Sequence, residues 1–173
     1  VNADLVTYGK VIGGGMPVGA FGGKKEIMEH ISPLGNVYQA GTLSGNPVAM
    51  IAGYTLLKTL NENPSIYLEL EEKTNMLHSG LNEVFKTSGI PYVINQVGSM
   101  ISIHFSKKPV VDFATASQSN IELFKKFFHA MLKRGVYLPP SAFESWFICY
   151  ALTRDDIDFA INAANESLKE ILH

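Results

Sequence analysis

A single lysine, Lys10, lies between a short apolar stretch and a run of glycines that ends in a proline (residues 7–20). A lysine amine held at a strand end beside a glycine-walled cleft can form a Schiff base with an aldehyde cofactor. Glycines lack Cβ, so a flat ring and its substrate can approach the backbone closely. The run is not a P-loop, because no Gly-Lys-Ser/Thr follows, and Gly13, Gly15 and Gly19 miss the dinucleotide fingerprint by one residue. A solvated lysine beside a flexible turn is the alternative.

A second group of residues, Gly41 and Thr42, precedes the expected start of a helix at Asn46-Pro47. Backbone N–H groups, a hydroxyl and a helix N-terminus together favour phosphate binding. The alternative is a well-capped helix start with no ligand. Taken with Lys10, a phosphate-binding turn indicates one cofactor, pyridoxal phosphate.

Composition sets limits on the class of protein. The chain has 173 residues, 46% of them hydrophobic, and a net charge of −2 from 14 basic and 16 acidic residues, so no basic surface indicates nucleic acid binding. The single cysteine, Cys149, excludes an internal disulfide and fits a reducing, cytoplasmic compartment, and we expect its thiol to be buried. No apolar stretch is long enough for a membrane span. The histidines show no metal-binding spacing, so we expect no metal site.

The first third of the chain is expected to be the closing part of a larger α/β domain. A short buried strand is expected over residues 5–8, and a second short strand over residues 18–21. Helices are expected over 24–31 and from Asn46-Pro47 to about residue 60, with a loop over 36–44 between them. The partners of the first strand are expected outside this sequence, since one strand is not stable alone.

The turn at Asn61-Glu62-Asn63-Pro64 predicts a boundary between domains 1–62 and 63–173. After it, the periodicity predicts a long amphipathic helix stopped by Gly89 and Pro91, and a later helix ended by Gly135. A capping box begins the final helix at Thr153. Strands are expected over residues 92–97, 100–105, 136–138 and 147–152. The second domain is therefore expected to be α+β, with helices on one face of a small sheet.

Several runs resemble class III pyridoxal-phosphate-dependent aminotransferases, and within them the glutamate-1-semialdehyde aminomutase branch. These runs are residues 8–20, 21–28, 38–47, 127–132 and 135–144. The resemblance covers nearly the whole chain, in order. It implies a fold-type-I homodimer with a large cofactor domain and a smaller C-terminal domain, of which this chain is the C-terminal portion.

The resemblance also implies roles for individual residues. Lys10 would bond to the cofactor and move protons between the two reacting carbons. Gly41 and Thr42 would bind the cofactor phosphate in the neighbouring subunit's site, and Glu144 would lie near the substrate amino groups. The cofactor would be pyridoxal 5'-phosphate, with its pyridoxamine form in the cycle. For Glu144, a solvated loop carboxylate is the alternative.

Three functions remain open. An aminomutase converts glutamate-1-semialdehyde to 5-aminolevulinate in tetrapyrrole biosynthesis, an ω-aminotransferase needs a 2-oxo acid acceptor, and a non-catalytic relative would be a binding module. An arginine is expected where a site holds glutamate, but neither Arg134 nor Arg154 lies in residues 139–144. The family's upstream phosphate loop and pyridine-binding residues are expected before Val1, so we expect this chain alone to be inactive or nearly so.

Overall fold

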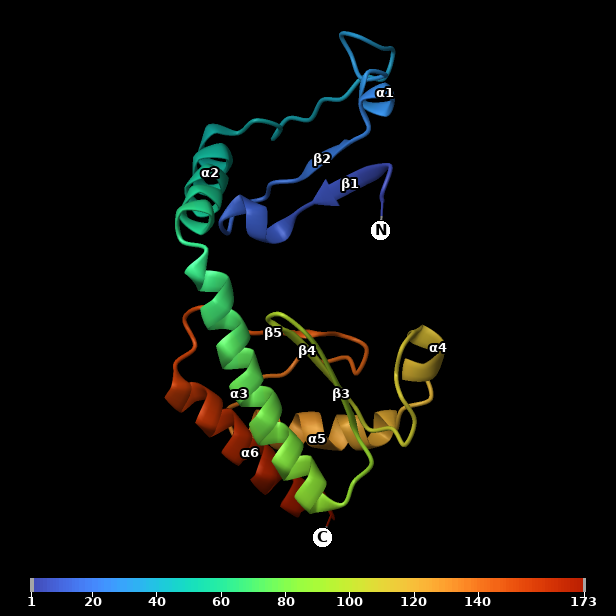
Figure 1. Ribbon diagram of the computed structural model, residues 1–173, viewed down its shortest axis with the longest axis vertical. Coiled ribbons are helices and arrows are strands. Elements are labelled where there is room, and N and C mark those ends of the chain that lie inside the picture. The colour runs from blue at the N-terminus through green and yellow to red at the C-terminus, as the bar shows by residue number, and fades with distance from the viewer. Residues whose placement is uncertain (1, 173) are drawn as a thin grey trace. The chain divides into compact units, whose positions relative to one another are not determined.

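The structure is a computed structural model that describes residues 2–172, and the chain divides into two compact units between Pro64 and Ser65 (Figure 1). Each unit has its own helices and strands. Among the described residues, no helix combines the length and the apolar character needed to cross a membrane.

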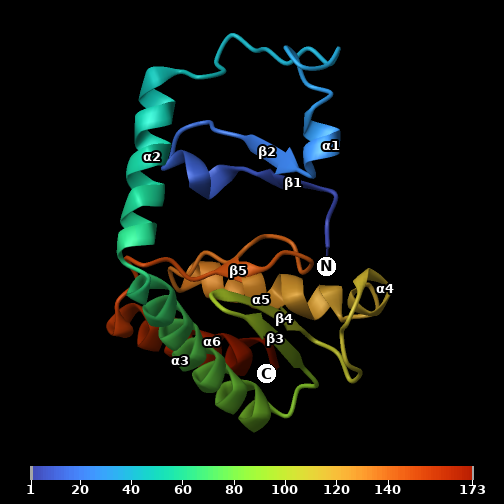
Figure 2. The same cartoon turned by 45° about the horizontal axis from the view of Figure 1, so that its top comes forward.

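The first unit pairs a small β-ribbon with one long helix. Its elements are β1 (Leu5–Tyr8), the 3-10 helix η1 (Lys10–Gly13), β2 (Ala20–Gly23), α1 (Lys25–Met28) and α2 (Pro47–Glu62). The two strands are antiparallel, with Leu5 opposite Gly23 and Tyr8 opposite Ala20. Helix α2 packs against η1, the turn that follows β1 (Figure 2). The Lys10 turn therefore leads from the ribbon to the surface of α2.

The predicted first strand is confirmed in place, but two expectations about it are wrong. It is exposed along its length rather than buried, and it has a partner within this chain, β2. The second strand begins at Ala20, two residues later than expected, because β2 starts opposite the end of β1 and Pro17 has no N–H to donate. The helix expected over 24–31 is a single turn, α1.

The start of α2 is as predicted. The Asn46 side-chain oxygen accepts hydrogen bonds from the N–H groups of Val48 and Ala49, each at 3.1 Å. Pro47 occupies the first helical position, where its missing N–H is not needed. This cap fixes the point at which the loop over residues 36–44 enters the helix.

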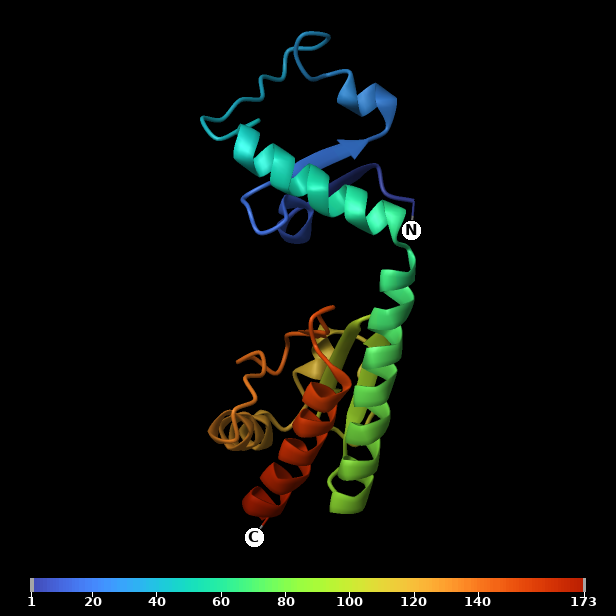
Figure 3. The same ribbon diagram turned by 90° about the vertical axis from the view of Figure 1, so that its left-hand side faces the viewer.

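The second unit combines three long helices and the single-turn helix α4 with a three-stranded sheet. Its elements are α3 (Ser65–Ser88), β3 (Val93–Val97), β4 (Met100–His104), α4 (Phe113–Ala116), α5 (Ile121–Lys133), β5 (Trp146–Phe147) and α6 (Arg154–Leu172). The strand order is β3-β4-β5 with antiparallel pairing throughout. Helices α3 and α6 lie side by side (Figure 3), and α5 also packs on α6.

The core of this unit explains why the helices cover one face of the sheet, as predicted. Phe85 of α3 and Phe127 of α5 are fully buried with their ring centroids 5.8 Å apart. On β4, alternate residues Ile101 and Ile103 point into this core, whereas Met100 is exposed. The alternation is that of a strand with one buried face.

Two strand predictions in this unit are wrong. No strand forms over residues 136–138, because the N–H of Val136 donates to the carbonyl of Met131 at 3.0 Å and so closes the end of α5. The strand expected over 147–152 is only β5, because the chain turns where Leu152 N donates to Cys149 O at 3.3 Å. The Cys149 thiol is therefore exposed, not buried.

The helices are closer to expectation. The Thr153 capping box is present: the Thr153 N–H and hydroxyl both donate to the Asp156 carboxylate at 2.7 Å, which lowers the pKa of Asp156. Helix α4 has a similar cap, in which Asp112 accepts from the N–H of Thr115. The sequence analysis missed α4, because a single turn contains too few residues to show periodicity.

Candidate active site

Lys10 lies two residues after the end of β1, beyond Gly9, and opens the η1 turn. Its backbone is left-handed, with φ of 50°, and no other non-glycine residue among 2–172 has a positive φ in the left-handed region. Its side chain is exposed, and within the described residues its amine makes no hydrogen bond or ion pair. A left-handed conformation at a residue without a short polar side chain is strained and marks a place to look for function.

The glycines after Lys10 have a different role from that expected. A Cβ on Gly13 would lie 3.3 Å from Val18, and one on Gly14 would lie 2.6 Å from the carbonyl oxygen of Ala52 in α2. Only the Gly15 position has open space around it within this run. Close packing of the turn, rather than room for a ring, therefore accounts for Gly13 and Gly14.

Gly41 and Thr42 lie in the exposed loop that leads into α2. Among residues 2–172, neither their N–H groups nor the Thr42 hydroxyl donates a hydrogen bond, whereas the Gly41 carbonyl accepts from Ser44 N at 2.9 Å. A hollow of about 440 Å³ adjoins this loop and is lined by Gln39, Ser44 and Phe21 among others. Two backbone N–H groups and a hydroxyl without partners among the described residues, in one short loop segment, are donors that suit an anion. No hydrogen bond joins them to Lys10 within the described residues.

Glu144 belongs to the second unit, in the exposed loop between α5 and β5. Its carboxylate accepts a hydrogen bond from Ser141 N at 3.1 Å, and its own N–H donates to Ser141 O at 3.1 Å. These two bonds close a tight turn at residues 141–144. The second carboxylate oxygen has no hydrogen-bond partner in the part of the chain that the structure describes, so it can still accept from a ligand.

A sequence model of the aminotransferase class-III family matches residues 1–171. The chain belongs to the class III aminotransferases. A glutamate-1-semialdehyde 2,1-aminomutase from Flavobacterium johnsoniae is 56% identical over 169 residues, which are 98% of this chain and 40% of that protein. A protein of the same name from Thermus thermophilus is 52% identical over 168 residues, 97% of this chain and 39% of its own length. The predicted resemblance is confirmed, and the chain spans about 40% of the length of the curated relatives it matches.

Solved structures confirm the predicted fold-type-I α/β class. An omega-transaminase from Sphaerobacter thermophilus superposes with a TM-score of 0.84 at 27% identity, covering 98% of this chain and 39% of that one. A glutamate-1-semialdehyde-aminomutase from Pseudomonas aeruginosa PAO1 has a TM-score of 0.80 at 21% identity, covering 97% and 39%, and is evidence for the fold alone.

In this class III chain both arginines of the second unit are occupied or placed at helix ends. Arg134 donates to the carbonyls of Ala130 at 3.0 Å and Glu166 at 3.2 Å, and it pairs with Glu170 at 2.7 Å. The same pair holds the pKa of Glu170 below its ordinary value. Arg134 therefore ties α5 to α6, and Arg154 is the first residue of α6.

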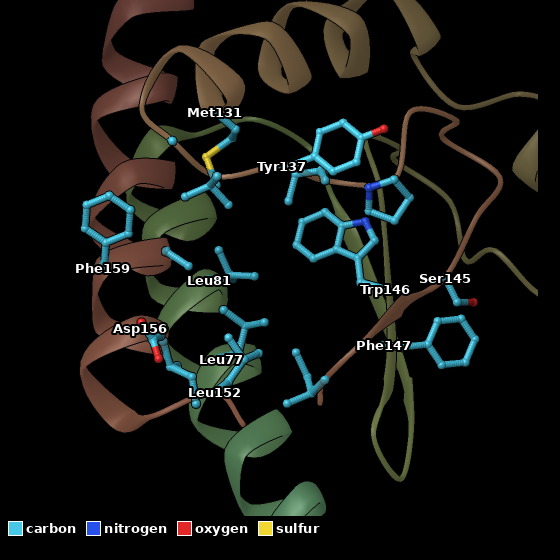
Figure 4. A pocket seen from close by; sticks show the side chains of 17 residues that line it. Leu77, Leu81, Met131, Tyr137, Ser145, Trp146, Phe147, Leu152, Asp156 and Phe159 are labelled. Atoms are coloured by element: carbon cyan, nitrogen blue, oxygen red, sulfur yellow. The ribbon is translucent and has the colours of Figure 1, made fainter. Parts of the chain in front are cut away.

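The second unit also has an apolar cavity of about 600 Å³ (Figure 4). Leu77 and Leu81 of α3, Trp146 of β5 and Phe159 of α6 line it, and Asp156 adds a carboxylate. Glu144, the candidate residue that belongs to the same unit, does not line this cavity. Trp146 is buried, as its position in an apolar run predicts.

The sequence analysis missed one residue of α2 that contacts the Lys10 turn, Gly53. The small residues of α2 predict tight packing against a sheet or another helix, but Gly53 instead lies on η1, where a Cβ would be 2.6 Å from the carbonyl oxygen of Ile12. Ala49 and Gly53, both buried in the structure, are four residues apart, a spacing that places them on one face of the helix but does not identify the segment that packs against it.

Proposed function

We propose that this chain is the lysine-bearing C-terminal part of a pyridoxal-phosphate-dependent aminomutase, which converts glutamate-1-semialdehyde to 5-aminolevulinate in tetrapyrrole biosynthesis. The observation that carries the proposal is Lys10, an exposed amine without a partner among the described residues, on a strained turn. The high identity to curated aminomutases over nearly the whole chain supports this choice of reaction.

The residues fit the cofactor chemically. When bound, pyridoxal phosphate supplies an aldehyde carbon that bonds to a primary amine with loss of water and a ring that delocalises the electron pair left by a removed proton, and it alternates between pyridoxal and pyridoxamine forms. Lys10 provides the primary amine. The N–H groups of Gly41 and Thr42 and the Thr42 hydroxyl, in the loop that precedes α2, provide hydrogen-bond donors for a phosphate.

Proton transfer is the task of Lys10 once its amine is free. An amino group that moves between two carbons of one molecule requires a proton to leave one carbon and another to be added elsewhere. An amine on a flexible four-carbon stem can reach both positions, whereas a guanidinium stays protonated and cannot act as a base. Glu144 lies near the substrate amino groups in this proposal, and its free oxygen accepts from an ammonium group.

The assembly proposed is a cytoplasmic homodimer in which Gly41 and Thr42 bind the phosphate in the neighbouring subunit's site. Residues 1–62 belong to the large cofactor domain and residues 63–173 form the small one. The exposed, unpaired donors of Gly41 and Thr42 support a ligand that this chain does not itself cover.

An ω-aminotransferase is the second candidate, and the likeness to an omega-transaminase at 27% identity favours it. The two reactions differ in their need for an acceptor. We expect the full-length protein, loaded with pyridoxamine phosphate, to convert glutamate-1-semialdehyde to 5-aminolevulinate with no added 2-oxo acid. A reaction that proceeds only with a stoichiometric 2-oxo acid would replace the aminomutase with the aminotransferase. The engagement of Arg134 with Glu170 supports the first outcome, since it leaves that arginine occupied.

A further inference from the structure

The backbone of Lys10 needs support from its surroundings. Its φ of 50° lies in the left-handed region, which lysine rarely adopts because its Cβ then crowds the backbone. The preceding residue, Gly9, is extended, with φ of −156°. The change from extended to left-handed backbone therefore takes place at Lys10 itself. A conformation of this kind persists only where neighbouring structure holds it.

Helix α2 holds the turn by direct contact between backbones. A Cβ on Gly53 would lie 2.6 Å from the Ile12 carbonyl oxygen, and a Cβ on Gly14 would lie 2.6 Å from the Ala52 carbonyl oxygen. Each glycine thus lies against a carbonyl of the other segment: Gly53 of α2 against the turn, and Gly14 of the turn against α2. Gly53 is buried, as is Ala49 one helical turn earlier.

Hydrogen bonds within the turn connect the residues that contact α2 to Lys10. Ile12 N donates to Gly9 O at 3.4 Å, and Gly14 N donates to Val11 O at 3.1 Å, so residues 9–14 form one continuous turn. Fixing the Ile12 and Gly14 peptides therefore fixes the Cα of Lys10. Backbone atoms have no rotamer to change, so a Cβ at residue 53 can be accommodated only if α2 or the turn moves.

We propose that Gly53 is a positioning residue for Lys10, because its missing side chain lets α2 seat the turn that sets the lysine amine. The inference rests on the proposed function only in assigning Lys10 the bond to pyridoxal phosphate. Misplacing a reacting atom by about 1 Å costs roughly 100-fold in rate. Gly53→Ala in the full-length protein is accordingly expected to slow bond formation between Lys10 and pyridoxal phosphate roughly 10- to 100-fold.

The test separates positioning from general damage. The rate of bond formation is followed by stopped-flow absorbance and by borohydride trapping at Lys10. Binding of pyridoxamine phosphate is measured alongside, because it has no aldehyde and needs no lysine bond. We expect its affinity in Gly53→Ala to stay within about twofold of the unmodified protein, because a residue that acts only on Lys10 leaves the rest of the cofactor site unchanged.

The matched control is Gly22→Ala, because a Cβ on Gly22 meets no atom within 4 Å and Gly22 has no left-handed φ. It is expected to react at the rate of the unmodified protein. If Gly53→Ala does not accumulate as folded protein, Gly14→Ala tests the same contact from the side of the turn. Because Gly14 has a left-handed φ of 58°, its own control is Gly89→Ala, at a glycine with φ of 70° and no atom within 4 Å of an added Cβ. The positioning role is wrong if the folded variant, Gly53→Ala or Gly14→Ala, forms the bond between Lys10 and pyridoxal phosphate at an unchanged rate. It is also wrong if the affinity of that variant for pyridoxamine phosphate falls in parallel with the rate. If the unmodified protein forms no trappable bond at Lys10, the proposed function itself is wrong.

Discussion

Lys10 combines a reactive side chain with a backbone conformation that favours glycine. The left-handed region costs a non-glycine residue roughly 1–2 kcal/mol relative to glycine. A lysine at such a position lowers the stability of the fold, a cost that the proposed role of its amine would explain. This is the pattern expected when local strain belongs to a functional site.

Two substitutions of Lys10 test whether the lysine is needed for turnover and whether its backbone conformation lowers stability. Lys10→Ala and Lys10→Gly are both expected to lose turnover by roughly 10²- to 10⁴-fold or more, since both lack the amine. Lys10→Gly is expected to unfold with a free energy about 1 kcal/mol higher than Lys10→Ala, because glycine relieves the left-handed strain but is more flexible when unfolded. Chemical denaturation of both variants measures the difference. A Lys10→Gly variant less stable than Lys10→Ala would mean that the turn imposes no left-handed strain, because only the greater flexibility of unfolded glycine would then separate the two.

His104 gives the second unit a sensitivity to acid. Its ring is buried at the end of β4, its Nδ1 has no hydrogen-bond partner among the described residues, and burial lowers its pKa. The unfolded chain then binds a proton more readily than the folded one. Stability is therefore complete above the unfolded pKa of about 6.5 and falls as the pH drops from there toward the folded pKa.

Urea denaturation between pH 7.5 and 5, values chosen to span about 6.5, measures this loss. His104→Leu is expected to remove part of the pH dependence, because the unfolded state of the variant has no imidazole to protonate at that position. His129→Leu, a change at a more accessible ring on α5, is the matched control. An unchanged acid sensitivity in His104→Leu would assign the loss to other groups.

At the scale of elements, α2 links both parts of the candidate site. Its N-terminus receives the Gly41–Thr42 loop through the Asn46 cap, and its middle seats the Lys10 turn through Gly53. Asn46→Ala is expected to lower the free energy of unfolding by about 1 kcal/mol, whereas Asn46→Asp retains a capping oxygen and stays close to the original. Thermal unfolding of the full-length protein compares the two. A loss as large in Asn46→Asp as in Asn46→Ala would show that the cap is not what stabilises this helix start.

The elements that the sequence predicted well are those whose cause is local. The spacing of Leu77, Leu81 and Phe85 and the Thr153 capping box follow from residues three or four apart. The strand predicted over residues 136–138 is absent because the Val136 N–H closes the end of α5. The strand predicted over residues 147–152 is shorter because only two residues of this segment of the chain, in β5, pair with β4. Apolar runs of that length do not by themselves show which backbone groups already have partners.

In the candidate site, too, the residues that could be predicted are those whose signal is local in the sequence. Lys10, Gly41 and Thr42 could be proposed from motifs, because their chemistry lies in their own residue types. Gly53 could not, because its role depends on an approach to Ile12, which lies about forty positions earlier in the chain. Such contacts become visible only once the chain is folded.

At the scale of the whole molecule, the two units differ in how much of their apolar surface they cover. Among residues 2–172, all the buried hydrophobic side chains except Ala49 of α2 belong to the second unit. In the first unit Tyr38 and Val11 are 83% and 66% exposed, although large exposed groups such as Val111 occur on the second unit too. Large exposed apolar groups on a small unit indicate contact with other protein surface. The proposed dimer and large domain would provide that surface.

Hydrogen exchange on the isolated 173-residue chain tests this difference. The amides of β4 and α5 are expected to be protected, and those of β1 and β2 to exchange near the rate of an unfolded chain, since a two-stranded ribbon is marginal alone. In the full-length protein the β1 amides are expected to gain protection. Equal protection of both units in the isolated chain would mean that the first unit needs no further cover.

The most direct test of the account is the site of covalent attachment. The full-length protein is incubated with pyridoxal phosphate, reduced with borohydride, digested and mapped by mass spectrometry. We predict that the pyridoxyl group is found on the peptide that carries Lys10, and that Lys10→Arg, which keeps the charge but cannot form the bond, gives no label there. A label on a different lysine, or a labelled protein in which Lys10 is unmodified, would contradict the central claim.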